Sequence, residues 1–168
     1  MNAKLLIGAL IMTVLQVLFA PIITINSIVP NFMLAFVIAC AVAIPDENHL
    51  VFAFIMGLIY DLVSAGPVGA MAFACVVVSF IASLVLSKLP VNNLGISIVA
   101  IIVSVLVVEF IYGLFQIGLY VDVTFFDILT YRVLPCTMYD IILGIIMFPI
   151  MVKVSMPRID ADFINNGR

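Results

Sequence analysis

Two apolar runs separated by a turn decide the fold of this chain: LVFAFIMGLIYDLV at residues 50–63 and VGAMAFACVVVSFIASLVL at residues 68–86. The turn between them, Ser64-Ala65-Gly66-Pro67, combines the two residue types that most strongly interrupt helices. The hydrocarbon core of a bilayer is about 30 Å thick, and a helix needs about 20 apolar residues to cross it. The two runs therefore predict a pair of membrane-embedded helices.

The composition of the whole chain supports a lipid environment. Of 168 residues, 67% are hydrophobic and only 9% are charged, whereas about a quarter of the residues of a soluble domain are charged. Six Lys/Arg and nine Asp/Glu could not cover the surface of a packed core of this size. The net charge of −3 also excludes a nucleic-acid-binding protein, because too few cations are present to neutralise a phosphate track.

Further apolar runs extend the same pattern along the chain. Six of them are separated by Pro, Gly, Asn or charged residues, at 5–20, 31–44, 50–63, 68–86, 94–119 and 134–154. We expect an all-α integral membrane protein, a compact bundle of about six transmembrane helices that forms one domain over 1–154 and is followed by a cytoplasmic tail at 155–168. The runs 31–44 and 50–63 are short, so a helical hairpin that enters the bilayer without crossing it is an alternative for these two.

The basic residues predict the orientation. With a cytoplasmic N-terminus, one basic residue, Arg132, falls outside and five fall inside: Lys4, Lys88, Lys153, Arg158 and Arg168. This bias obeys the positive-inside rule and predicts a multi-pass membrane protein with both termini in the cytoplasm. The longest external segment, 120–133, fits either a helix along the outer interface, with Phe125, Phe126, Leu129 and Val133 on one face, or a plain loop.

Catalytic and metal-binding patterns are missing from the sequence. Cys40, Cys75 and Cys136 are isolated in apolar sequence and lack the spacing of a zinc or iron–sulfur site. The single His49 leaves no Ser-His-Asp grouping for hydrolysis. We therefore expect no enzyme, no cofactor and no metal site.

Three carboxylates within the apolar runs are the strongest candidates for functional residues. Asp61, Glu109 and Asp140 each have a glycine four residues away, at Gly57, Gly113 and Gly144 respectively. Residues at this spacing share a helix face, and glycine lets a neighbouring helix approach while the acid makes a hydrogen bond across the contact. Such acids either hold helices together or form a proton or ligand site, and both readings stay open. Gln16 is predicted to hold helices together in the same way.

The residues 57–69, Gly-Leu-Ile-Tyr-Asp-Leu-Val-Ser-Ala-Gly-Pro-Val-Gly, resemble a characteristic segment of the MreD family of bacterial rod shape-determining membrane proteins. Pro30-Asn31-Phe32 is similar to the family's entry into the second span, although many relatives carry Asp where this chain has Asn31. Tyr139-Asp140 stands where the family has a tyrosine followed by Asn or Asp. The chain length and the near absence of loops also agree with this family.

The resemblance implies a non-enzymatic scaffold of the cell-wall elongation machinery. MreD-like proteins bind MreC, a single-pass protein with an extracytoplasmic domain, and are linked through it to RodA, a class B penicillin-binding protein and, indirectly, MreB. Their fold is similar to the substrate-binding subunits of energy-coupling-factor vitamin transporters. Membrane lipid is a further expected partner. The residues expected to bind partners or pack helices are Ala53, Gly57, Asp61, Gly66, Pro67, Gly69, Glu109, Gly113, Asp140 and Gly144.

The fold similarity also supplies an alternative function, a membrane-embedded subunit that binds a vitamin for a transporter. In that case Glu109 and Asp140 would line an external pocket. The chain has no Trp to stack on a heterocycle and few external loops that could close over a ligand, and both facts argue against this alternative. An intramembrane enzyme ranks third, because no metal-binding HExxH helix or nucleophile–base pair is present.

Overall fold

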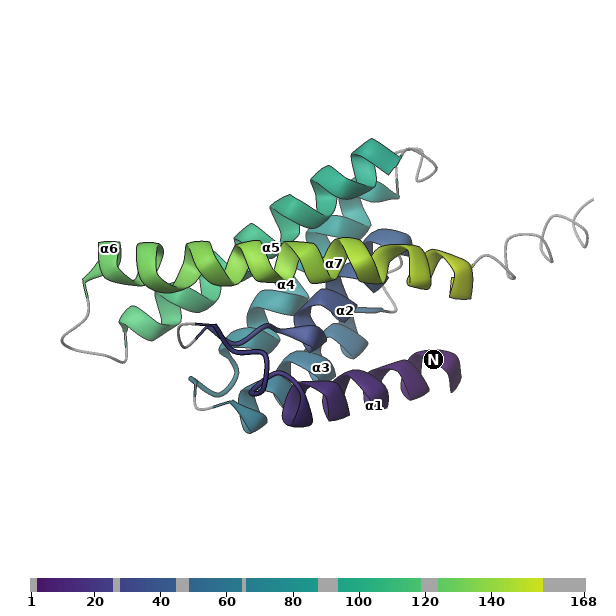
Figure 1. Cartoon of the computed structure of the whole chain (residues 1–168). Helices are drawn as coiled ribbons and strands as arrows, with labels where there is room; N and C mark the ends of the chain where they lie inside the picture. Colours follow the sequence, from purple (N-terminus) through teal and green to yellow (C-terminus); the bar gives the residue numbers. More distant parts are fainter. Residues whose placement is uncertain are drawn as a thin grey trace, which may run out of the picture.

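The computed structural model describes residues 3–25, 28–44, 49–64, 66–87, 94–118 and 124–155, and these residues are almost entirely helical. The elements, in chain order, are α1 (Ala3–Leu18), α2 (Phe32–Ala43), α3 (His49–Val63), α4 (Ala70–Leu86), α5 (Leu94–Ile117), α6 (Phe125–Ile128), η1 (Leu129–Val133) and α7 (Leu134–Ser155). Within these ranges the only extended pairing is an isolated bridge between Ile25 and Ile28. The chain is thus all-α, as predicted (Figure 1).

Each predicted apolar run corresponds to one helix. The ends differ by at most two residues, and the described link between α3 and α4 contains the predicted Gly66 and Pro67. The start of α4 shows why: Gly69 has a φ of 94°, a left-handed conformation that glycine adopts readily, and it forms the N-cap of the helix. The predicted loops around Asp46 and Lys88 and the tail after Ser155 lie outside the described residues.

The shortest of the main helices, α2, forms the centre of the molecule. Ten consecutive residues, from Met33 to Val42, are buried, as expected for a helix that is hydrophobic on every side. It contacts α1, α3, α4, α5 and α7 (Figure 1). At 1.5 Å per residue, its 12 residues span about 18 Å, whereas the 24 residues of α5 span about 36 Å. A short central helix therefore stands among longer neighbours.

The main helices run in alternating directions. In Figure 1, α1 begins at the end of the molecule where α7 finishes. The start of α6 lies at the opposite end, and α2 starts short of that end, nearer the middle of the molecule. The described first and last helices therefore share one end of the bundle, which is the arrangement that an even number of passes requires.

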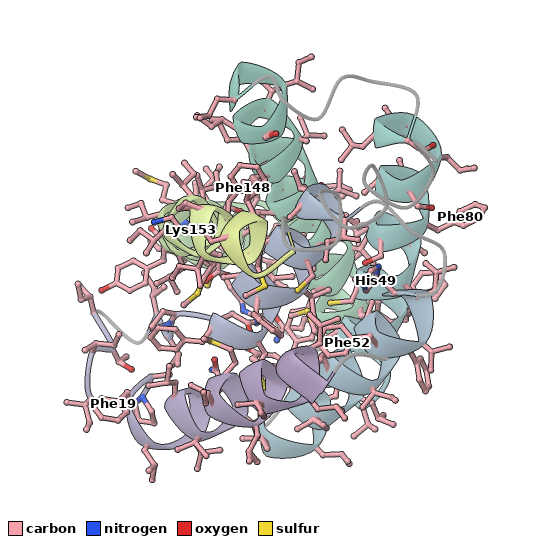
Figure 2. The ribbon with its side chains drawn as sticks, turned by 90° about the vertical axis from the view of Figure 1, so that its right-hand side faces the viewer. Phe19, His49, Phe52, Phe80, Phe148 and Lys153 are labelled. Carbon is pink, nitrogen blue, oxygen red and sulfur yellow. The ribbon has the colours of Figure 1, made fainter. Side chains whose placement is uncertain are left out.

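The outside of the molecule exposes many large apolar side chains. Large hydrophobic side chains are exposed on every long helix, among them Leu10, Val51, Phe80, Leu94 and Met138. In Figure 2, Phe19 and Phe80 point away from the bundle, whereas Phe52 lies inside it. Monomeric soluble proteins rarely expose apolar surface on this scale.

Two helical stretches are long and apolar enough to cross a membrane, Leu94–Ile117 and Phe125–Lys153. The remaining apolar helices have 10 to 17 residues. The second long stretch combines α6, η1 and α7 without a break. Its middle part, η1, is a π-helix in which the Leu134 N–H donates to the Leu129 carbonyl, five residues earlier. Of the two alternatives for the external segment, its described part, 124–133, is therefore helical, and it continues directly into α7.

Candidate functional site

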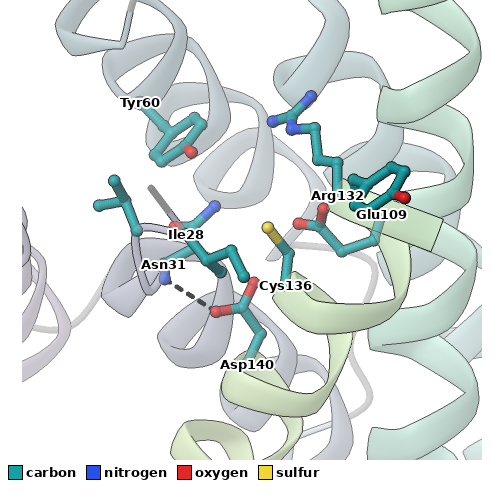
Figure 3. A pocket seen from close by; sticks show the side chains of 9 residues that line it. Ile28, Asn31, Tyr60, Glu109, Arg132, Cys136 and Asp140 are labelled. Atoms are coloured by element: carbon teal, nitrogen blue, oxygen red, sulfur yellow. Dashed lines mark hydrogen bonds between the residues drawn. The ribbon is translucent and has the colours of Figure 1, made fainter. Parts of the chain in front are cut away.

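A polar cavity lies beyond the N-terminus of α2, where the short central helix leaves space among its longer neighbours. Its volume is about 330 Å³. The residues that line it come from the segment before α2 and from α3, α5, η1 and α7: Ile28, Val29, Asn31, Tyr60, Glu109, Tyr131, Arg132, Cys136 and Asp140. In Figure 3, Asn31, Cys136 and Asp140 point toward the same space.

The start of α2 is held by side chains from α1 and α7. The backbone N–H of Asn31 donates to Oδ1 of Asp140 over 2.8 Å, shown dashed in Figure 3, and the side chain of Asn31 accepts from the Leu34 N–H over 2.8 Å. Gln16 Oε1 accepts from the Phe32 N–H, and Gln16 Nε2 donates to the Pro30 carbonyl. The first N–H groups of a helix have no partner within the helix, so these contacts satisfy them at a depth where water is scarce. The predicted role of Gln16 in joining helices is confirmed.

Three buried polar atoms in the cavity wall have no hydrogen-bond partner among the residues that the structure describes. They are Asn31 Nδ2, Arg132 Nη1 and Asp140 Oδ2. Asn31 and Asp140 are only 2% and 1% exposed, and Glu109 beside them is 3% exposed. Buried polar groups are normally paired, and leaving one unpaired costs about 1–3 kcal/mol. Three such atoms around one space indicate a site for a polar group from outside the chain.

Arg132 is held over an aromatic ring. Its guanidinium carbon lies 4.6 Å from the ring centroid of Tyr112, a cation–π arrangement. Tyr112 is itself 1% exposed, and the ring of Tyr60 packs edge-on against it with centroids 6.3 Å apart. Arg132 therefore reaches the cavity from a fixed position, and it interacts electrostatically with both Glu109 and Asp140.

Asp61 occupies a separate, internal position. Its carboxylate accepts three backbone N–H groups at the start of α4, from Gly69 at 2.9 Å, Met71 at 3.2 Å and Ala72 at 3.1 Å. Gly69 has no side chain to cap α4, so the acid from α3 provides the cap instead. A carboxylate is also favoured there by the partial positive charge of the helix N-terminus. Asp61 therefore joins α3 to α4.

The glycine one turn before Asp61 lets these two helices touch. A Cβ built on Gly57 would lie 2.5 Å from the Ala72 Cα and 2.7 Å from the Ala72 N, so no side chain fits there. Ala53, a further turn away, is 1% exposed. The stripe Ala53-Gly57-Asp61 thus lies inside the molecule, and a partner cannot contact it without displacing α4.

The other predicted glycines also mark close contacts. A Cβ on Gly66 would collide with the hydroxyl of Tyr112, one on Gly113 would lie 2.8 Å from Val133 Cγ2, and one on Gly144 would lie 2.9 Å from Ile101 Cγ2. Pro67 follows Gly66 in the link between α3 and α4. Of the ten predicted site residues, therefore, only Glu109 and Asp140 meet in the cavity, and the others lie at contacts between helices or in this link.

The sequence reading missed most of the cavity wall, and Arg132 and Cys136 above all. A signal for them was present, because Arg132, Cys136 and Asp140 are spaced by four residues and such residues share a helix face. The contributions of Tyr60 and Asn31 depend on the packing of α2 and α3, which no spacing reveals.

The chemistry available in the cavity is hydrogen bonding and charge pairing. Two carboxylates, one guanidinium, one carboxamide, one thiol and two phenols surround it. Among the described residues, no group of three or more His, Cys, Asp or Glu is arranged to hold a metal ion. The wall offers both donors and acceptors and thus suits a binding site.

Comparison with known proteins identifies one family. The family model described as rod shape-determining protein MreD matches residues 2–157, nearly the whole chain. No curated protein and no solved structure matches the chain.

Proposed function

Because this chain belongs to the MreD family of rod shape-determining membrane proteins, we propose that it is a scaffold that binds MreC and links it to the wall-synthesis machinery. RodA, a class B penicillin-binding protein and MreB would be connected through MreC. The family is one of shape-determining proteins, and the polar groups of the cavity suit a binding role without any chemical step. Membership in the family carries the shape-determining function, and the cavity suggests where a partner binds.

We further propose that the protein crosses the cytoplasmic membrane six times with both termini in the cytoplasm. The alternating directions of α1 to α5 and of α6–α7 support this topology (Figure 1). The shortness of α2 is compatible with it, since Pro30 and Asn31, directly before this helix, are buried in protein and Asn31 borders a polar cavity. A bundle of six spans is also what the similarity to energy-coupling-factor subunits would require.

The observation that carries the proposed binding site is the set of unpartnered buried atoms on Asn31, Arg132 and Asp140. In the proposed orientation the cavity lies in the outer half of the membrane. This is the level at which the MreC chain would pass from its transmembrane helix into its extracytoplasmic segment. A polar segment of MreC that enters the cavity would satisfy these atoms. Docking there would fix the direction in which the MreC stem leaves the membrane.

Cys136 gives a direct test of this site. It lines the cavity and is partly exposed, whereas Cys40 and Cys75, the only other cysteines, are buried. We expect a small thiol reagent to label Cys136 in nanodiscs and bound MreC to protect it at least tenfold. The variant Cys136→Ala, which should lose nearly all labelling, is the control. Equal labelling with and without bound MreC would rule out docking at the cavity.

The vitamin-binding alternative is supported by one observation, namely that Glu109 and Asp140 do line one cavity. Gentle purification from the native membrane separates the two functions. A co-purified single-pass wall-synthesis protein supports the scaffold. An ATPase-linked module or a retained vitamin would support the transporter subunit instead.

A further inference from the structure

We infer that the group recognised in the cavity is an amide, contributed either by the side chain of an Asn or Gln of MreC or by an exposed peptide unit of its backbone. This inference rests on the proposed function, which names the partner, and adds the chemistry by which the partner is recognised. It follows from the kinds of atoms that are left without partners.

The unpartnered atoms are of opposite kinds. Arg132 Nη1 and Asn31 Nδ2 are donors, whereas Asp140 Oδ2 is an acceptor. The side chains of Asp140 and Glu109 interact with each other, but among the described residues no donor pairs with Asp140 Oδ2, and Arg132 Nη1 and Asn31 Nδ2 have no acceptor. A visiting group must therefore offer at least one acceptor and one donor to satisfy the wall.

Charged groups fit the wall less well. A carboxylate would accept from Arg132 and Asn31, but it would face Asp140 and Glu109, which are both almost fully buried. An ammonium group would suit these two acids but would face Arg132 and leave its Nη1 unpaired. Charges in a medium of low dielectric interact strongly, so either mismatch is costly.

A neutral amide avoids both mismatches. Its carbonyl oxygen can accept from Arg132 and Asn31 while its N–H donates to Asp140. It also carries no net charge that would have to be removed from water. The fixed positions of Asp140 at the start of α2 and of Arg132 over Tyr112 set the spacing between donor and acceptor before the partner arrives.

Two substitutions distinguish an amide from a carboxylate and from an ammonium group by the direction in which each changes MreC binding. In Asp140→Asn, the side-chain oxygen can keep the hydrogen bond from the Asn31 N–H, so the new NH₂ replaces the free acceptor. In Arg132→Gln, the donor at Nη1 and its charge are both lost. An amide partner predicts that each substitution weakens MreC binding. A carboxylate partner predicts that Asp140→Asn strengthens binding, and an ammonium partner predicts that Arg132→Gln strengthens it.

The measurement is the dissociation constant of full-length MreC with the protein in nanodiscs. We expect Kd to rise about tenfold for each substitution, since about 1.4 kcal/mol corresponds to a factor of ten and lies within the cost of an unpaired buried group. Lys153→Gln is the matched control, because it removes one positive charge from an exposed residue near the end of α7 that does not line the cavity. Its Kd should stay within twofold of the unsubstituted protein.

Two checks keep the outcome decisive. The thermal unfolding midpoint of each variant in detergent shows whether the fold is kept, and Arg132→Lys replaces Arg132→Gln if the latter unfolds. Lysine retains the charge but cannot place a donor at the Nη1 position, so Kd should again rise. For either cavity variant, a lower Kd, or a Kd within twofold of that of the unsubstituted protein, would overturn the amide assignment.

Replacing in turn each Asn and Gln of the extracytoplasmic MreC segment next to its transmembrane helix with Ala identifies the source of the amide. A tenfold loss at one position assigns a side chain, and no loss at any position assigns the backbone; both results keep the inference. If unsubstituted MreC fails to protect Cys136, the docking site in the proposed function fails. If MreC protects Cys136 but the sign pattern differs, only the amide assignment fails.

Discussion

At the scale of single residues, the acids within the apolar helices have two different roles. Asp61 accepts three N–H groups at the start of α4 and is enclosed by the protein. Asp140 uses one oxygen to hold the start of α2 and leaves the other toward the cavity. The sequence placed both among candidate residues because each stands in an apolar run with a glycine four residues away. Their environments differ because one faces a helix that it caps and the other a space beside a short helix.

Asp61→Asn should lower stability without a specific loss of partner binding. The carboxylate has two oxygens for three donors, and the carboxamide would turn an NH₂ group toward one of them. Losing a buried hydrogen bond in this way costs about 1–3 kcal/mol. We expect a lower unfolding midpoint in detergent and less protein in the membrane. Full abundance and an unchanged midpoint together with lost function would point instead to a proton-carrying role for Asp61.

At the scale of helices, the π-helix η1 explains a packing that the sequence did not predict. The α-helical spacing placed Phe125, Phe126, Leu129 and Val133 on one face. In the structure, Val133 and Ile128 are the buried residues, whereas both phenylalanines are exposed. Ile128 and Val133 are five residues apart, yet both would contact a Cβ on Gly113. The π-helical hydrogen bond between residues five apart brings Ile128 and Val133 to one face. The apolar periodicity of the sequence does not predict such a π-helix.

Deleting Thr130 should therefore be tolerated. The deletion leaves Ile128 and Val133 four residues apart, and a regular α-helix places residues at that spacing on one face. Thr130 is exposed, and its hydroxyl donates to the Phe126 carbonyl within the same helical stretch. Deleting Ile142, which is also exposed but lies in the regular part of α7, should rotate one half of that helix by about 100° against its neighbours. We expect the first deletion to keep the unfolding midpoint within a few degrees and the second to abolish folding. Equal loss of stability in both proteins would contradict this account of η1.

At the scale of the whole molecule, composition and apolar runs were sufficient to predict an all-α bundle and the position of each main helix. They were not sufficient to predict the cavity. The cavity exists because α2 is short. Its 12 residues span about 18 Å, whereas the neighbouring helices α5 and α7 have 24 and 22 residues and extend past it. The sequence showed that the run 31–44 was short, but it did not show that this run lies at the centre. Only the packing of five helices around α2 turns its shortness into a polar space.

The same arrangement joins stability to binding. Apolar residues fill the core around α2 and also cover the outside, where lipid takes the place of water. Buried acids and amides gather at the two helix starts, that of α4 with Asp61 and that of α2 with Gln16, Asn31 and Asp140. The first set is closed by hydrogen bonds within the chain and the second is left incomplete. That difference distinguishes a structural contact from the proposed docking site.

Site-specific photo-crosslinking in living cells tests the docking of MreC most directly. Tyr131 stands at the mouth of the cavity and is 79% exposed, whereas Leu10 on α1 is 67% exposed and lies outside the cavity. A benzophenone amino acid at position 131 should capture MreC, and the same probe at position 10 should capture far less of it. Asp140→Asn combined with the probe at position 131 should reduce capture. Equal capture from both positions, or no capture of MreC at position 131 in cells of normal shape, would contradict the assignment of this cavity as the docking site.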